Sequence, residues 1–235
     1  MFAALGTLGI VAGPPGLCLG HFSAESPSEM YPSDWSLIQF GDSGTPTAYN
    51  LVQADTSVVM RARSEGSAGG LITYQRVNLN VHPVVEWRWR VRSTPDEGDI
   101  TEKSTDDAAA RLYVTFDYDG LGLMDRLKLA VLRGMGYGDL PTRALNYVWS
   151  SRLPKGEMRP SPYTEQIMMK SVRSGSTRVG QWVQESQNVR EDYREAFGED
   201  PPPVAGVALM TDTDNTGGSV EAFYGDIVFR RAPSQ

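Results

Sequence analysis

Cysteine and histidine are nearly absent from this chain of 235 residues, which contains Cys18, His21 and His82 and no others of either type. A single cysteine excludes both an internal disulfide and a cysteine-based zinc site. Two histidines leave little material for a histidine-rich metal centre or for a Ser-His-Asp triad. Most zinc and triad chemistry is therefore disfavoured from the start.

Clustered positive charge is also lacking. The chain has 22 Lys and Arg against 29 Asp and Glu, a formal net charge of -7, and no run of basic residues interleaved with aromatics. Such a chain would repel a phosphate backbone, so nucleic acid is not an expected partner.

The apolar segment at residues 1–20 is too short and too interrupted, at Gly13-Pro14-Pro15, to span a bilayer. No transmembrane segment is predicted. We interpret residues 1–20 as the remnant of a signal peptide, with small residues at Cys18 and Gly20 before the cleavage point, and residues 21–33 as a polar linker. A flexible apolar tail on a cytosolic protein is the alternative. The expected location is the periplasm or the extracellular space.

Short alternating segments separated by Gly, Pro, Asn and Asp fill the rest of the chain. In 84–91, strict alternation places Trp87 and Trp89 on one face, which we expect to be the core face. Eleven such segments are candidate strands: 35–40, 49–53, 57–62, 70–77, 84–91, 111–118, 145–150, 166–172, 182–188, 204–210 and 220–229. They predict an all-β fold, a two-sheet antiparallel β-sandwich similar to a jelly roll, as one domain over 34–231.

Two helical patterns interrupt these strands. In 121–135, Leu123, Leu127 and Val131 recur at helical spacing, which favours a helix packed on one sheet. The second predicted helix covers 191–197 and ends at Gly198, a residue suited to a helix C-terminus.

A set of short motifs occurs in a specific order along the chain. They are Trp87-Arg88-Trp89, the segment from Asp106-Asp107 to Arg111, Tyr147-Val148-Trp149, Glu191-Asp192-Tyr193, and the segment from Thr211 to Thr216. Together they resemble the bacterial family catalogued as domain of unknown function 3047, over roughly 35–229. The resemblance implies an exported domain with a jelly-roll-like fold, and it brings no activity with it.

Carboxylates and an amide follow the predicted strand 204–210. Asp212, Asp214 and Asn215 offer the hard oxygen ligands that calcium takes, and glycines after them allow a tight bend. The segment is not a complete EF-hand loop, so a calcium site would need a further ligand, for which Asp226 and a backbone carbonyl are the candidates. The alternative is a turn in which Asp and Asn bond their own backbone.

A second polar group precedes the strand 111–118. Asp106, Asp107 and Arg111 could bind a sugar, with Asp107 accepting and Arg111 donating hydrogen bonds to hydroxyl groups. The alternative is a salt bridge that fixes the preceding loop to the sheet.

Tyr147 and Trp149 lie two residues apart on a predicted strand and therefore share a face. Core packing explains most strand aromatics, but an exposed pair would stack on a pyranose ring. Together with Asp192, these residues complete the predicted ligand-binding set.

Three functions are compatible with these residues. The first is an exported carbohydrate-binding domain for a poly- or oligosaccharide, with calcium as the candidate cofactor. The second is a glycan-cleaving enzyme, either a hydrolase with two carboxylates roughly 5 to 9 Å apart or a lyase using Tyr and Arg. Its candidate carboxylates are Glu86, Asp106, Asp107, Asp192 and Asp212. The third is a structural or interaction protein of the cell envelope.

Overall fold

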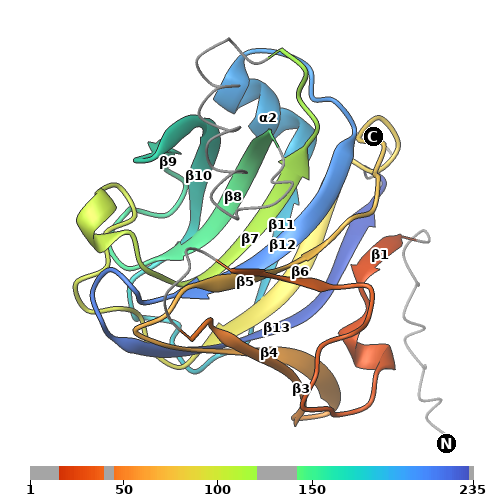
Figure 1. Cartoon of the computed structure of the whole chain (residues 1–235). Helices are drawn as coiled ribbons and strands as arrows, with labels where there is room; N and C mark the ends of the chain where they lie inside the picture. Colours follow the sequence, from red (N-terminus) through yellow and green to blue (C-terminus); the bar gives the residue numbers. More distant parts are fainter. Residues whose placement is uncertain (1–15, 40–44, 121–141, 233–235) are drawn as a thin grey trace, which may run out of the picture.

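Two β-sheets pack face to face in the computed structural model, which describes residues 16–39, 45–120 and 142–232 (Figure 1). The six-stranded sheet contains β1 (Leu17–Gly20), β3 (Ala48–Ala54), β4 (Ser57–Glu65), β6 (Val84–Val91), β11 (Val183–Asn188) and β13 (Ser219–Arg230). The seven-stranded sheet contains β2 (Ser36–Gln39), β5 (Gly69–Thr73), β7 (Ala108–Phe116), β8 (Arg143–Ser150), β9 (Met158–Ser161), β10 (Thr164–Ser174) and β12 (Val204–Asp212). The predicted β-sandwich is confirmed, and each of the eleven candidate strands overlaps an observed one.

One part of the fold prediction is wrong, because the sandwich is not purely antiparallel. The strands of the seven-stranded sheet follow the order β2-β5-β12-β7-β8-β10-β9. β8 and β10 are parallel neighbours, whereas β9 pairs antiparallel with the other edge of β10. After β8 the chain forms β9 at the edge of the sheet, and β10 then runs between β9 and β8, parallel to β8. β9 was not predicted, since it has only four residues and includes Pro160.

The sandwich begins earlier than residue 34. β1 pairs antiparallel with the C-terminal half of β13, and the one-turn 3-10 helix η1 (Phe22–Ala24) follows. Leu19 and Phe22 are buried, and the Phe22 ring lies 5.4 Å from that of Trp35. The Ser23 amide and hydroxyl both donate to Asp226. Residues 17–24, which belong to the predicted leader and linker, therefore pack as part of the structure, and removal of the leader during export stays a prediction.

Aromatic side chains fill the space between the sheets. Trp87 and Trp89 of β6 point inward, as their alternation predicts, and meet Tyr147 and Trp149 of β8. Ring centroids are 5.5 Å apart for Trp87 and Tyr147 and 6.0 Å apart for Trp89 and Trp149. All eight residues of β8 are buried, because the strand has hydrogen-bonded neighbours on both sides and cover on both faces.

The helix α2 (Val189–Phe197) confirms the second helical prediction. The Asn188 side chain accepts a hydrogen bond from the Glu191 amide at the N-terminus, and Gly198 ends the helix with φ of 73°. The helix predicted over 121–135 lies outside the described residues. None of the helices described is long and apolar enough to cross a membrane.

Candidate functional site

The buried guanidinium of Arg111 joins the two polar groups that the sequence suggested separately. Its Nε lies 2.8 Å from Asp212 Oδ1, and its Nη2 lies 2.9 Å from Asp212 Oδ2. Nη2 also donates to the carboxylate and the backbone carbonyl of Asp106, at 2.8 and 2.9 Å. The groups meet because β7 and β12 are antiparallel neighbours, with Met210 opposite Arg111. Asp212 is therefore the bidentate partner of Arg111, and the ion pair with Asp106 fixes the loop before β7, as the salt-bridge alternative predicts.

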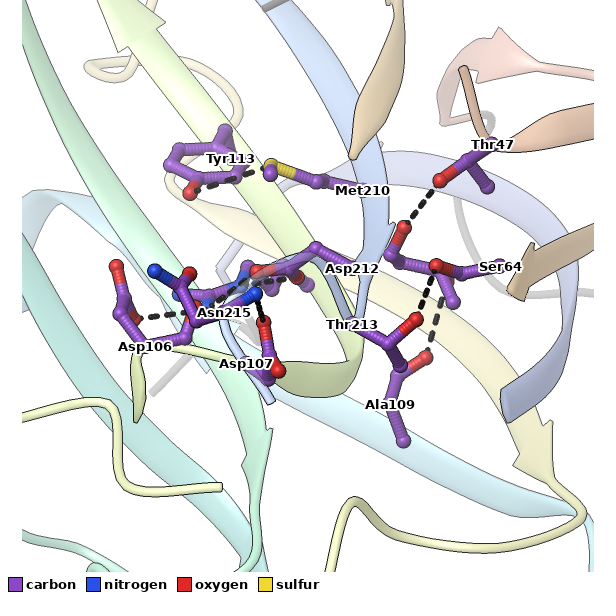
Figure 2. A network of polar contacts seen from close by, with 12 residues as sticks. Thr47, Ser64, Asp106, Asp107, Ala109, Tyr113, Met210, Asp212, Thr213 and Asn215 are labelled. Carbon is purple, nitrogen blue, oxygen red and sulfur yellow. Dashed lines mark hydrogen bonds and ion pairs between the residues drawn. The ribbon is translucent and has the colours of Figure 1, made fainter. Parts of the chain in front are cut away.

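Asp107 holds the loop that follows β12. Its carboxylate accepts a hydrogen bond from the amide of Asn215 at 3.1 Å (Figure 2). It also accepts from the amide and the hydroxyl of Thr216, at 2.7 and 2.6 Å. The loop closes on itself through a bond from the Gly217 amide to the Thr213 carbonyl, and Gly217 has φ of +73°, where a side chain would be strained. The segment therefore forms a turn, which a bond within its own backbone and the carboxylate of Asp107 stabilise.

Carboxylates crowd this end of the sandwich. One oxygen each from Asp107, Asp212 and Asp214 lie within 4.8 Å of one another. Burial raises the pKa of Asp212 to about 7, against the opposing effect of Arg111. Burial also raises the pKa of Asp106 and of Asp214. The single guanidinium of Arg111 does not offset the four carboxylates of Asp106, Asp107, Asp212 and Asp214. We call these four residues the acidic group, and it has an excess of negative charge.

These three aspartates could hold a metal ion. They supply only hard oxygen ligands, the type that calcium prefers, and Asp214 is exposed to solvent. Arg111 opposes such an ion by its charge and already occupies both oxygens of Asp212, so Asp214 and the remaining lone pairs of Asp107 would carry most of the coordination. Asp226 does not join them, because its carboxylate is bound to Ser23.

An exposed tyrosine that no sequence pattern predicted, Tyr163, borders the acidic group. Tyr163 lies in the hairpin between β9 and β10, is 54% exposed, and donates its hydroxyl to the Lys103 carbonyl at 3.1 Å. The same carbonyl accepts the Asn215 side-chain amide at 3.0 Å. Burial raises the pKa of Tyr163, with a further contribution from the charge of Asp106, whereas a hydrogen bond with Asn215 lowers it. Tyr163 and Asn215 thus form one polar and aromatic surface, next to the Asp106 carboxylate, whose side chain is 12% exposed.

The remaining predicted ligand residues lie inside the protein. Tyr147 and Trp149 are fully buried, so the prediction that they form an exposed pair for stacking on a sugar ring is wrong. The Tyr147 hydroxyl donates to Asp192 at 2.9 Å, and the Lys170 ammonium lies 2.7 Å from the other oxygen of that carboxylate. Asp192 therefore fixes α2 to β8 and β10, away from the acidic group.

No open pair of catalytic carboxylates is found at the described acidic group. Asp107 is fully buried and accepts three hydrogen bonds, and Asp212 is 2% exposed and paired with Arg111. Glu86 forms an ion pair with Arg230, and both residues belong to the six-stranded sheet, whereas Asp107 and Asp212 lie at the seven-stranded sheet. The geometry therefore lends no support to a hydrolase that uses these carboxylates.

Sequence comparison decides the family. The family model described as "Protein of unknown function (DUF3047)" matches residues 33–228. The chain belongs to this family. The DUF3047 motifs around Asp107 and Asp212 are those that meet at Arg111, so two of the segments that carry the resemblance build the site.

Other comparisons are more distant. A search of curated proteins found no match. Among solved structures, the DUF3047 chain is similar to the Emp47p carbohydrate recognition domain, with a TM-score of 0.41 and 11% identity over 92% of this chain and 95% of the other.

Proposed function

We propose that this protein is an exported, non-catalytic domain that binds a saccharide at the surface formed by Tyr163 and Asn215 next to Asp106, with a calcium ion held by Asp107, Asp212 and Asp214. The observation that carries the proposal is the Tyr163 ring, which stays 54% exposed although the Lys103 ammonium lies 5.6 Å from its centroid, and which is held beside carboxylate and amide groups. An aromatic ring stacks on the apolar face of a sugar, and adjacent Asp and Asn side chains bond its hydroxyls.

Replacing Tyr163 with alanine should weaken saccharide binding by about tenfold or more, because the variant loses the ring on which the sugar stacks. Tyr163→Phe keeps the ring and should bind within a few-fold of the parent. Calorimetry against a panel of neutral oligosaccharides measures both. Tyr74→Ala, which removes a tyrosine that is 59% exposed, is the matched control. Equal affinity of the parent and Tyr163→Ala would contradict the proposal.

Calcium should raise the unfolding temperature, because a ligand that binds only the folded state stabilises it by about 2.7 kcal/mol at 100 times its Kd. Thermal unfolding in EDTA and then in millimolar calcium measures the shift. Asp214→Asn should lose most of it, since the variant removes the exposed carboxylate of the group. Asp117→Asn, which changes an exposed aspartate paired with Arg76, should retain it. If calcium does not raise the unfolding temperature of the parent protein, the proposed site does not bind calcium.

A further inference from the structure

Arginines gather on the outer face of the six-stranded sheet. On β6, Arg88 and Arg90 alternate with buried tryptophans and therefore point away from the core. Cross-strand pairing places Phe223 of β13 between Arg90 and Arg61 of β4. Arg63 lies further along β4 on the same face. We call this surface the arginine face, formed by Arg61, Arg63, Arg88, Arg90 and Arg92.

Aromatic rings fix the guanidinium groups. Cζ of Arg88 lies 4.8 Å from the centroid of the Trp182 ring, and Cζ of Arg90 lies 4.9 Å from the same ring. Arg90 is also 4.7 Å from the ring of Phe223, which is 4% exposed. Such cation–π contacts hold planar groups in one orientation. An anion that binds here meets donors whose positions are already set, so less side-chain freedom is lost on binding.

A glycine makes room for Arg88. The pairing of β13 with β6 shifts between Tyr224 and Ile227, and Gly225 lies in this irregular segment. A Cβ atom at Gly225 would come within 2.6 Å of Arg88 Cγ and 2.7 Å of its Nε. Any larger residue at that position would therefore displace the Arg88 side chain.

The arginine face has more positive than negative charge, in contrast to the chain as a whole. Asp55 lies 3.6 Å from Arg90, and Glu221 pairs with Arg92 and, at 3.9 Å, with Arg61. Within the described part of the chain, no carboxylate forms an ion pair with Arg63 or Arg88. In a protein with a net charge of -7, these two unpaired guanidiniums indicate an anionic partner.

We propose that the arginine face binds an acidic polysaccharide, whose carboxylates pair with Arg63 and Arg88. Planar guanidiniums donate two parallel hydrogen bonds to a carboxylate, a geometry that ammonium groups do not offer. The Phe223 ring is buried and two guanidiniums lie over the Trp182 ring, which disfavours single-stranded nucleic acid, whose bases need exposed rings for stacking. The exposed large apolar side chains of the described residues are Met30, Tyr74, Val81 and Tyr163, so none projects from β4, β6 or β13 to insert into a membrane. This surface is separate from the Tyr163 site.

Polygalacturonate is the probe, and EDTA is present throughout so that the acidic site and calcium bridging do not contribute. Calorimetry at low ionic strength should show binding that weakens as salt rises. The double variant Arg63→Gln/Arg88→Gln should bind about tenfold more weakly or worse. Gly225→Ala, which keeps every charge but displaces Arg88, should also lose affinity. Arg76→Gln/Arg159→Gln removes two exposed arginines elsewhere and should bind as the parent does.

Thermal unfolding checks that each variant is folded. If the double variant does not fold, the single variant Arg63→Gln, which changes an exposed side chain, replaces it in the binding test. Neutral dextran should not bind to this surface. The proposal is overturned if the double variant retains the parent affinity, or if both double variants lose affinity equally. Tighter binding of single-stranded DNA or of phosphatidylglycerol vesicles than of polygalacturonate would also overturn it. Loss of neutral-saccharide binding in Tyr163→Ala leaves this proposal unaffected.

Discussion

Replacing Arg111 with methionine is expected to destabilise the fold by about 3–5 kcal/mol, the cost typical of removing one partner of a buried ion pair. Arg111 donates two bonds to Asp212 and two to Asp106, and it is 2% exposed. Methionine fills much of the same volume but leaves the Asp212 carboxylate buried without its partner. Denaturant unfolding measures the loss, which is a large fraction of the stability of an ordinary domain.

The matched control is Arg76→Met, because Arg76 pairs with Asp117 on the surface and should cost at most about 1 kcal/mol. The double variant Arg111→Met/Asp212→Asn should be more stable than Arg111→Met alone, since it removes the uncompensated carboxylate. An Arg111→Met protein as stable as the parent would show that Arg111 is not a structural residue. The sugar-binding interpretation of Arg111 would then regain support.

Replacing Trp149 with alanine should also cost about 3–5 kcal/mol, the range for removing a large aromatic residue from a core. Its ring is fully buried against Trp89, and its Nε1 donates to the Gly175 carbonyl at 3.1 Å. Thermal unfolding should show a decrease of roughly 6–20 °C, at about 2–4 °C per kcal/mol for a chain of this size.

Trp149→Phe keeps part of the ring contact and should lose less stability, and Tyr74→Ala, at an exposed ring, should lose little. Saccharide affinity per folded molecule should be unchanged in Trp149→Phe, because Trp149 does not reach the surface. If Trp149→Phe kept the parent stability but bound saccharide more weakly, Trp149 would have to contact the sugar, which its burial argues against.

Local patterns predicted the strands well and the meeting of the polar groups poorly. Alternation around Trp87 depends only on the pleat of one strand, so it correctly identified the core face of β6. Asp107 and Asp212 are about a hundred residues apart, and they meet only because β7 pairs with β12. Strand order depends on the packing of the whole sheet, and no short segment encodes it.

The aromatic residues show a different limit. Spacing placed Tyr147 and Trp149 on one face, but it could not tell that β8 is an interior strand of its sheet whose residues are all buried. Tyr163 is a single aromatic in a hairpin beside Pro162, and it belongs to no periodic pattern. Asp226 appeared close to the acidic loop in sequence, yet its carboxylate is held by Ser23.

The pairing of β1 with β13 gives proteolytic processing a structural consequence. If export removes the chain up to Gly20, the backbone around Ile227 to Phe229 loses the strand that satisfies its hydrogen bonds, and the space filled by Leu19 is emptied. The mature molecule would then present an unprotected sheet edge. Such an edge can accept an extended segment from a second molecule, so trimming at the N-terminus would make the sandwich prone to strand exchange.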